Sequence, residues 1–133
     1  MTEKIVYENK NITCITVEWE ADFSELLGVL KNFFDDNDTE HLLLDFRNFS
    51  FNTIMRSNIR DLYEFFTSRA NTERRANGKT AFVGSNGLQI EIGKIFKAYS
   101  EIIGSPIKIS AFRSLKKAFS WLEEGDDVFD TTI

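Results

Sequence analysis

The sequence contains little of the chemistry that marks secreted or membrane proteins. Its 133 residues include one cysteine, Cys14, one proline and one histidine. A single cysteine excludes a disulfide within the chain and is typical of a reducing compartment. No apolar run approaches the roughly 18 residues that a membrane helix needs, and no signal peptide follows the opening residues MTEK. We therefore expect a cytoplasmic protein without a membrane span.

Groups suited to catalysis or metal binding are equally scarce. The lone histidine, His41, has no cysteine beside it and no identifiable serine partner, so neither a triad nor a metal cluster is indicated. The acidic stretch DDNDTE (35–40) lacks the glycine and the distal glutamate of a calcium loop. The glycines of FVGSNGLQ (82–89) do not match a dinucleotide-binding or phosphate-binding loop. Carboxylates are many but scattered, and no acid–base pair can be named. We predict no enzyme activity, no cofactor and no metal.

The net charge of −5 argues against a nucleic-acid partner, because binding to phosphate backbones needs clustered cations. This charge is unevenly distributed along the chain. Six basic residues accompany three acidic ones between Thr53 and Lys79, whereas an acidic tail without Lys or Arg begins at about residue 124. Solvated surface is the ordinary interpretation of both segments.

Length and periodicity predict a single domain over residues 1–133. The chain is 42% hydrophobic and contains thirteen phenylalanines, enough for a sizeable core. Residues 4–20 predict a β-hairpin, with period-two alternation in the second arm and a polar turn at residues 8–11. Apolar residues at helical spacing follow Asp22, which is placed as a helix cap.

Three short apolar segments predict the remaining strands, namely LLLDF (42–46), KTAFVG (79–84) and IKISAF (107–112). Helical patterns begin after Asn52 and after SNG (85–87). The second pattern predicts a buried stripe made of Leu88, Ile92, Ile95, Phe96, Tyr99 and Ile103. Because a helix separates each later strand from the next, we expect parallel neighbours and right-handed crossovers. The predicted fold class is α/β, a mixed and mostly parallel sheet of about five strands with four helices and an N-terminal β-hairpin.

The stretch SAFRSLKKAFSWLEEG (110–125) predicts how the chain closes its core. Ser114 is placed as the N-cap of a last helix. The apolar residues of this helix recur at i, i+3, i+4 and i+7, and they are Leu115, Ala118, Phe119 and Leu122. Small Ala118 permits close approach, and Trp121 covers the flank with a large apolar area. We therefore expect this helix to lie back across the sheet.

The element order, together with AFRSLKKAFSWL (111–122), resembles the STAS fold and specifically the SpoIIAA-like group of bacterial proteins, over about residues 4–125. In STAS proteins that antagonise anti-sigma factors, the loop after the central strand carries two aspartates, and a serine phosphorylated by a partner kinase follows the second. Asp45 matches the first aspartate, but Thr53 stands at the second and Ile54 at the serine. The resemblance therefore implies a protein-interaction module without the usual phosphoserine, with Thr53 and Ser57 as the remaining candidates for phosphorylation.

Two groups of residues are predicted to bind ligands or partners. The resemblance places partner binding at the loop after the central strand and at the next helix, where two arginines one turn apart favour an acidic protein surface. The predicted partner-binding residues are Asn52, Thr53, Arg56, Ser57 and Arg60. Two other helix starts carry groups that favour anions. The predicted anion-binding residues are Ser85, Asn86, Gly87, Arg113 and Lys116, for which helix capping and solvated charge are the alternative interpretation.

Two further hypotheses concern apolar surface. A lipid or other small apolar ligand would need a pocket lined by aromatic residues, and the candidates are Phe33, Phe34, Phe49, Phe51, Phe65 and Phe66. Phenylalanines on helices more often belong to a core. A homodimer is the other hypothesis, because the edge strand of the hairpin is open for pairing and the FFTSR segment (65–69) carries extra apolar surface.

Overall fold

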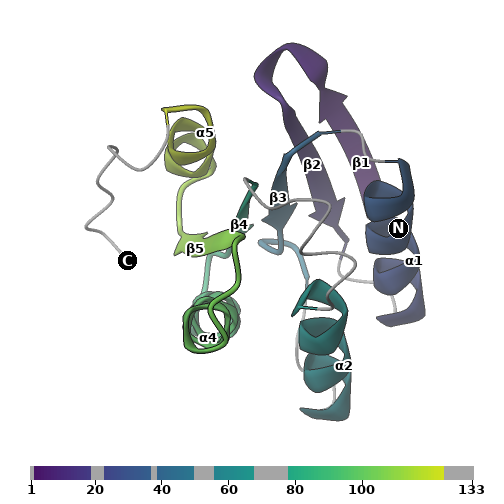
Figure 1. Cartoon of the computed structure of the whole chain (residues 1–133), viewed down its shortest axis with the longest axis vertical. Helices are drawn as coiled ribbons and strands as arrows, with labels where there is room; N and C mark the ends of the chain where they lie inside the picture. Colours follow the sequence, from purple (N-terminus) through teal and green to yellow (C-terminus); the bar gives the residue numbers. More distant parts are fainter. Residues whose placement is uncertain (1, 19–22, 37–38, 50–55, 68–77, 125–133) are drawn as a thin grey trace.

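The computed structural model describes residues 2–18, 23–36, 39–49, 56–67 and 78–124 (Figure 1). The elements in chain order are β1 (Thr2–Tyr7), the short 3-10 helix η1 (Glu8–Lys10), β2 (Ile12–Val17), α1 (Phe23–Asp36), β3 (His41–Asp45), α2 (Arg56–Thr67), β4 (Lys79–Val83), α4 (Gly87–Ile102), β5 (Lys108–Phe112) and α5 (Leu115–Glu124). This order confirms the predicted α/β fold class, with five strands and four α-helices among the described residues.

The strands form one mixed sheet in the sequential order β1-β2-β3-β4-β5. The β1 and β2 strands pair antiparallel, with Ile5 opposite Cys14, and every later neighbouring pair is parallel. The hairpin turns through η1 and Asn11, whose φ of 59° lies in the left-handed region. Asparagine tolerates that region better than most residues. The predicted hairpin and its polar turn are therefore confirmed.

The sheet carries a separate apolar cluster on each face. Because side chains alternate along a strand, Ile15 and Leu44 project to one face while Cys14 and Leu43 project to the other. Helices α1, α2 and α4 contribute to the first cluster, and α5 contributes to the second. We call these the three-helix face and the α5 face. Sequential parallel strands joined by crossovers of one hand place all crossover helices on the same face. Helix α5 follows the last strand and covers the other face (Figure 1).

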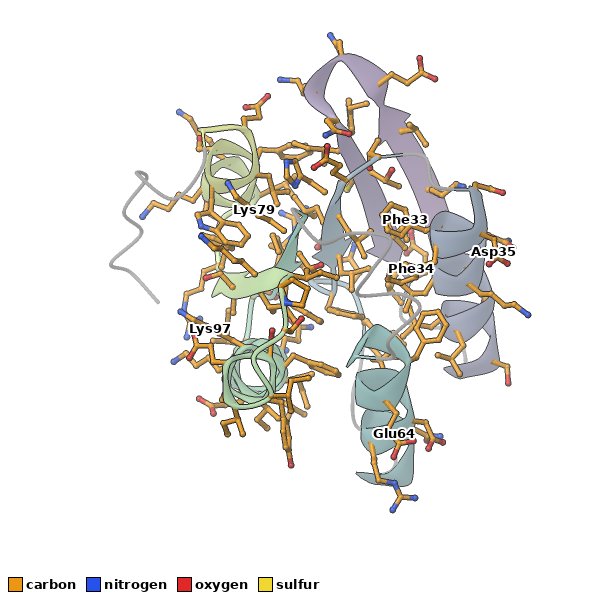
Figure 2. All side chains as sticks on the ribbon, in the orientation of Figure 1. Phe33, Phe34, Asp35, Glu64, Lys79 and Lys97 are labelled. Carbon is orange, nitrogen blue, oxygen red and sulfur yellow. The ribbon has the colours of Figure 1, made fainter. Side chains whose placement is uncertain are left out.

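Aromatic rings fill the three-helix face. Phe82 of β4 stacks between Phe46 and Phe96, with centroid separations of 5.7 and 5.2 Å. Phe33 and Phe34 point from α1 toward the sheet (Figure 2). Each such ring contributes roughly 2 to 3 kcal/mol through burial alone. The abundance of phenylalanine in the sequence is thus largely accounted for by this core.

Helix α4 corrects one sequence-based expectation. Of the predicted stripe, only Ile92 and Phe96 are buried, whereas Leu88, Ile95, Tyr99 and Ile103 are exposed. The face that meets the sheet is instead made of Gln89, Ile90, Ile92, Gly93, Phe96 and Ser100. The cause is close packing at Gly93, where an added Cβ would lie 2.9 Å from the Cβ of Ala111 and 3.0 Å from that of Phe82. Small residues let the helix approach the sheet on a face that hydrophobicity alone does not mark.

Helix α5 behaves as predicted from the sequence. The Ser114 hydroxyl accepts a hydrogen bond from the N–H of Lys117 at 3.2 Å, which caps the helix. Ala118 is fully buried and Leu122 nearly so. The ring of Trp121 packs on Phe112 with a centroid distance of 5.5 Å. Helix α5 therefore lies across β3, β4 and β5 and seals the α5 face.

Candidate functional site

The carboxyl ends of β3, β4 and β5 meet at one edge of the sheet, which we call the carboxyl edge (residues 45–49, 84–89 and 112–117). The chain leaving β4 enters α4 on one face, whereas the chain leaving β5 enters α5 on the other. A hydrogen bond of 3.0 Å from the N–H of Gly84 to the carbonyl of Phe112 joins the two strand ends. Ligands of parallel α/β sheets commonly bind outside the carboxyl ends of the strands.

A buried carboxylate and an arginine mark the end of the central strand. Asp45 is 3% exposed, and the guanidinium of Arg47 donates to both of its oxygens, at 2.9 Å from Nε and 2.8 Å from Nη2. The N–H of Arg47 also donates to Oδ1 at 3.1 Å. The hydrogen bond to Asp45 raises the pKa of Arg47, although partial burial opposes it. The two-point pairing compensates the cost of burying the Asp45 charge.

Gln89 fastens the loop after β3 to the loop after β4. Its Nε2 donates to the carbonyls of Phe49 at 2.9 Å and Arg47 at 3.3 Å. Its Oε1 accepts the N–H of Ser85 at 2.6 Å, and its own N–H donates to Oδ1 of Asn86 at 3.0 Å. Asn86 and Gln89 thereby form a capping box at the start of α4. Gln89 thus connects two loops that are far apart in sequence.

The sequence-based interpretation did not include Gln89 among the functional candidates. Its signal was present, because Asn86 and Gln89 stand three residues apart ahead of an apolar run, as in a capping box. Gly84 completes the junction, since an added Cβ there would lie 2.5 Å from the Cβ of Gln89. The glycine before SNG is thus needed for close approach of the strand end to the helix.

The predicted anion-binding residues follow two neighbouring strand ends at the carboxyl edge. Register pairing of Val83 with Phe112 places the start of α4 beside the start of α5, and all the predicted residues, Ser85, Asn86, Gly87, Arg113 and Lys116, are exposed. The side chains of Asn86 and Ser114 nevertheless cap their own helices. Capping accounts for the polar residues at both helix starts, and anion binding there stays a prediction.

The described structure covers only part of the predicted partner-binding set. Asn52 and Thr53 are outside the described residues, and Arg56 and Ser57 occupy the first turn of α2, where the structure does not describe their side chains. Arg60 is exposed one turn later. Asp61 and Glu64 of the same helix are also exposed, so the described charges of α2 have both signs. The candidate phosphorylation sites Thr53 and Ser57 are among these residues without described side chains.

Exposed side chains of opposite charge lie near the two ends of the carboxyl edge. Arg113, Lys116 and Lys117 are exposed at its β5 end. Glu25 is exposed in the first turn of α1, which follows β2 at the opposite end of the same edge. Among the described residues, the exposed charged side chains named here are positive after β5 and negative after β2, although the whole chain is acidic.

The remaining reactive side chains are engaged in the fold. The Nδ1 of His41 accepts the N–H of Lys79 at 3.1 Å. Cys14 is 7% exposed, and burial raises the pKa of its thiol to about 11. Among the described residues, no cluster of three or more His, Cys, Asp or Glu side chains is arranged to hold a metal ion. None of the described helices has the length and apolarity needed to cross a membrane.

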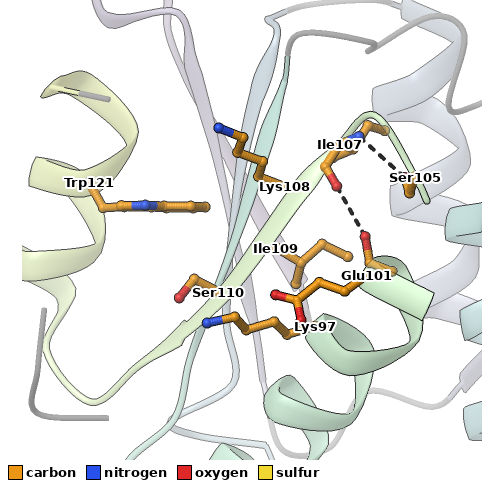
Figure 3. A pocket seen from close by; sticks show the side chains of 9 residues that line it. Lys97, Glu101, Ser105, Ile107, Lys108, Ile109, Ser110 and Trp121 are labelled. Carbon is orange, nitrogen blue, oxygen red and sulfur yellow. Dashed lines mark hydrogen bonds between the residues drawn. The ribbon is translucent and has the colours of Figure 1, made fainter. Parts of the chain in front are cut away.

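A small pocket of about 320 Å³ lies outside the carboxyl edge, beside the edge strand β5 (Figure 3). Trp121 of α5 forms one wall, and Lys97 and Glu101 of α4 form the other. Two of the serine hydroxyls that line it bond to backbone groups: Ser100 donates to the carbonyl of Ile107 at 3.1 Å, and Ser105 accepts the N–H of Ile107 at 3.2 Å. Residues of α4, β5 and α5 line this pocket, so no single stretch of sequence predicts it.

The aromatic residues proposed for an apolar ligand are mostly core residues where they are described. Phe33, Phe34 and Phe49 are each at most 2% exposed, and Phe65 packs edge-to-face on Phe34 with a centroid distance of 5.3 Å. Phe51 and the side chain of Phe66 lie outside the described part of the structure. The four described rings contribute to the apolar cluster of the three-helix face.

Comparisons with known proteins add no relative to this description. A scan against models of known families found no match, and searches of curated proteins and of solved structures found no significant match. The resemblance to STAS proteins therefore stays a prediction from the sequence.

Proposed function

We propose that this chain is a non-enzymatic protein-interaction module of the STAS, SpoIIAA-like type in bacterial regulation. It binds an acidic surface of a partner protein through residues 52–60, which follow the central strand in the sequence. The observation that carries this proposal is the Gln89 junction, because it holds the backbone at Arg47 and Phe49, directly after the central strand. Binding loops held by a rigid scaffold are the usual location of recognition residues.

The distribution of charge supports an acidic partner surface. Arg60 is exposed on α2, and Arg113, Lys116 and Lys117 are exposed after β5 at the carboxyl edge. Positive side chains in a protein of net charge −5 steer a negatively charged partner to one edge. Such association weakens as salt is added, because exposed charges are screened within about 8 Å at physiological ionic strength.

The use of reactive groups supports binding rather than catalysis. Asp45 is held at both oxygens by Arg47, and Nδ1 of His41 accepts a backbone N–H. The raised pKa of Cys14 keeps its thiol protonated at neutral pH, where a thiol is a weak nucleophile. These side chains position backbone and core, which is the expected use in a module that acts through its surface.

Charge reversal tests the proposal. A protein that copurifies with the tagged chain from its own host is first identified, and its Kd is measured for the wild type and for the Arg60→Glu variant. The control is Lys31→Glu, which makes the same charge change at an exposed position of α1. We expect Arg60→Glu to weaken binding about tenfold and the control to leave it nearly unchanged. Equal binding by all three proteins would refute the proposed surface, and a copurified small apolar molecule would favour the ligand hypothesis.

A further inference from the structure

Helix α4 exposes a second apolar face that the sheet does not cover. Six large apolar side chains are exposed among the described residues, and five belong to α4 or to the residue that ends it. Their exposed fractions are 48% for Leu88, 42% for Ile95, 48% for Tyr99, 79% for Ile102 and 51% for Ile103. Scattered apolar residues are normal on a surface, but a contiguous group marks an interaction site.

Helical geometry arranges four of these side chains in a line. At 3.6 residues per turn, Leu88, Ile95, Tyr99 and Ile102 fall within about 60° of arc and extend over about 20 Å. We call these four residues the α4 stripe. The face that packs on the sheet, centred on Gly93 and Phe96, lies about a third of a turn away. The helix is therefore apolar on two faces, and its contacts with the sheet explain only one of them.

The spacing of the stripe is symmetric about Ile95. Leu88 precedes it by seven residues and Ile102 follows it by seven, which is two helical turns in each direction. Consider an antiparallel pair of α4 helices related by a two-fold axis at Ile95. Leu88 of each copy then contacts Ile102 of the other copy, and the two Ile95 side chains contact each other. A self-complementary patch of this kind is what a two-fold homodimer interface requires.

We propose that the α4 stripe is the interface of a homodimer in which the two α4 helices pack antiparallel. This surface differs from the hairpin edge and the FFTSR segment considered from the sequence, and the inference does not depend on the proposed partner binding. Charges beside the stripe do not oppose self-association. Glu91 and Lys94 of the same helix lie 4.0 Å apart, so their opposite charges balance and two copies would not repel each other there.

The size of the patch fits a modest dimer. Two copies of the exposed side chains bring together on the order of 1,000 Å² in total, close to the roughly 1,200 Å² at which specific interfaces begin. Exposed Glu91 and Ala98, which adjoin the stripe, add to this area. An interface at the lower end of this range dissociates on dilution, so the dimer is expected to be concentration dependent.

Sedimentation velocity of the full chain, from about 1 to about 300 µM, is the first test. The wild type should shift from monomer toward dimer as concentration rises. Ile95→Asp places two carboxylates against each other at the axis and should raise the dimer Kd about 100-fold or more. The matched control is Ile5→Asp, an exposed apolar position of β1 that is 40% exposed, which should dimerise like the wild type. A wild type that stays monomeric, or dimers that survive Ile95→Asp, would overturn the proposal.

Disulfide trapping tests the antiparallel arrangement separately. Under oxidising conditions Ile95→Cys should cross-link to its own copy. Leu88→Cys and Ile102→Cys should cross-link when mixed and only weakly when alone, because each meets the other across the interface. Native Cys14 is buried and does not compete. Cross-linking of Leu88→Cys with itself at the rate of the mixture would indicate a parallel pair and would contradict the proposed geometry.

Discussion

Replacing Gln89 with leucine gives the most direct test of the junction that organises the candidate site. The substitution keeps a buried side chain of similar volume but removes the donor to the Phe49 carbonyl and the acceptor for the Ser85 N–H. An unsatisfied buried carbonyl costs about 1 to 3 kcal/mol, and loss of the capping box costs roughly a further 0.5 to 1 kcal/mol. Burial of the leucine offsets about 1 kcal/mol of this. The expected net loss in the free energy of unfolding is therefore about 2 kcal/mol.

Urea denaturation followed by circular dichroism measures this loss. The slope of free energy against urea should be unchanged, because the substitution does not alter the area exposed on unfolding. Amide hydrogen exchange at Ser85 should also accelerate, since its N–H loses its acceptor. A Gln89→Leu protein within about 0.5 kcal/mol of the wild type would refute the assigned role of these hydrogen bonds.

A companion variant separates hydrogen bonding from packing. Gln89→Glu conserves shape but turns a carboxylate toward the carbonyls of Arg47 and Phe49, where the wild type has a donor. Burial and the facing acceptors favour the protonated acid in the folded state, which raises the folded-state pKa of the new carboxyl group. The destabilisation is therefore present above that pKa and is relieved as the pH falls through it. If the loss of unfolding free energy in Gln89→Glu were the same at every pH between about 8 and about 5, altered packing would be its cause instead of the carboxylate charge.

Three further substitutions have definite expectations. Burial raises the pKa of Cys14 to about 11 from 9.0, so the stability advantage of the wild type over Cys14→Ala should fall by up to about 2 kcal/mol as pH rises through that window, measured by urea denaturation. Arg47→Ala leaves the Asp45 carboxylate buried without its arginine. We expect the free energy of unfolding to fall by about 2 kcal/mol, less than for a fully buried pair, because Arg47 is 39% exposed. The double variant Asp45→Asn/Arg47→Ala should recover part of this stability. Gly93→Ala should lower the melting temperature by the equivalent of about 1 kcal/mol, because the clash with Ala111 outweighs the gain in helix propensity.

The regular elements were predictable because their signals are local. Period-two alternation in β2 and continuous apolar runs in β3 and β4 identify strands without reference to the rest of the chain. The spacing of Ala118 and Leu122 likewise identifies the buried face of α5. Each of these segments packs its most apolar residues inward, so a pattern of hydrophobicity suffices.

The buried face of α4 was not predictable in the same way. Gln89 and Ser100 count as polar in any hydrophobicity pattern, yet both are buried and hydrogen-bonded to backbone carbonyls. Gly93 contributes no apolar area but sets how closely the helix approaches β4 and β5. The apolar side chains Leu88 and Ile95 then dominate the pattern although they face away from the sheet. A sequence periodicity cannot distinguish a face buried in the monomer from a face buried in an assembly.

Parts of the candidate site were predictable and parts depended on tertiary pairing. Ser85 and Arg113 could each be placed after a strand, but their common location follows from the pairing of β4 with β5. The contact between Gln89 and the Phe49 carbonyl joins residues forty positions apart. The pocket beside Trp121 similarly draws on α4, β5 and α5.

The proposed partner-binding surface and the α4 stripe together predict the stoichiometry of the complex. Helix α4 begins at the carboxyl edge and runs toward the opposite edge of the sheet, so an antiparallel pair places the two carboxyl edges at opposite ends of the dimer. Their separation is about 20 Å or more along the helix axis, and neither edge shields the other. Two partner proteins should therefore bind independently in a 2:2 complex, measured by light scattering after size exclusion. At concentrations near the wild-type Kd, Arg60→Glu should leave most of the dimer without partner, because its binding is about tenfold weaker, and Ile95→Asp should leave a 1:1 complex. A 2:1 complex would mean that the partner bridges both copies, and it would contradict the antiparallel arrangement.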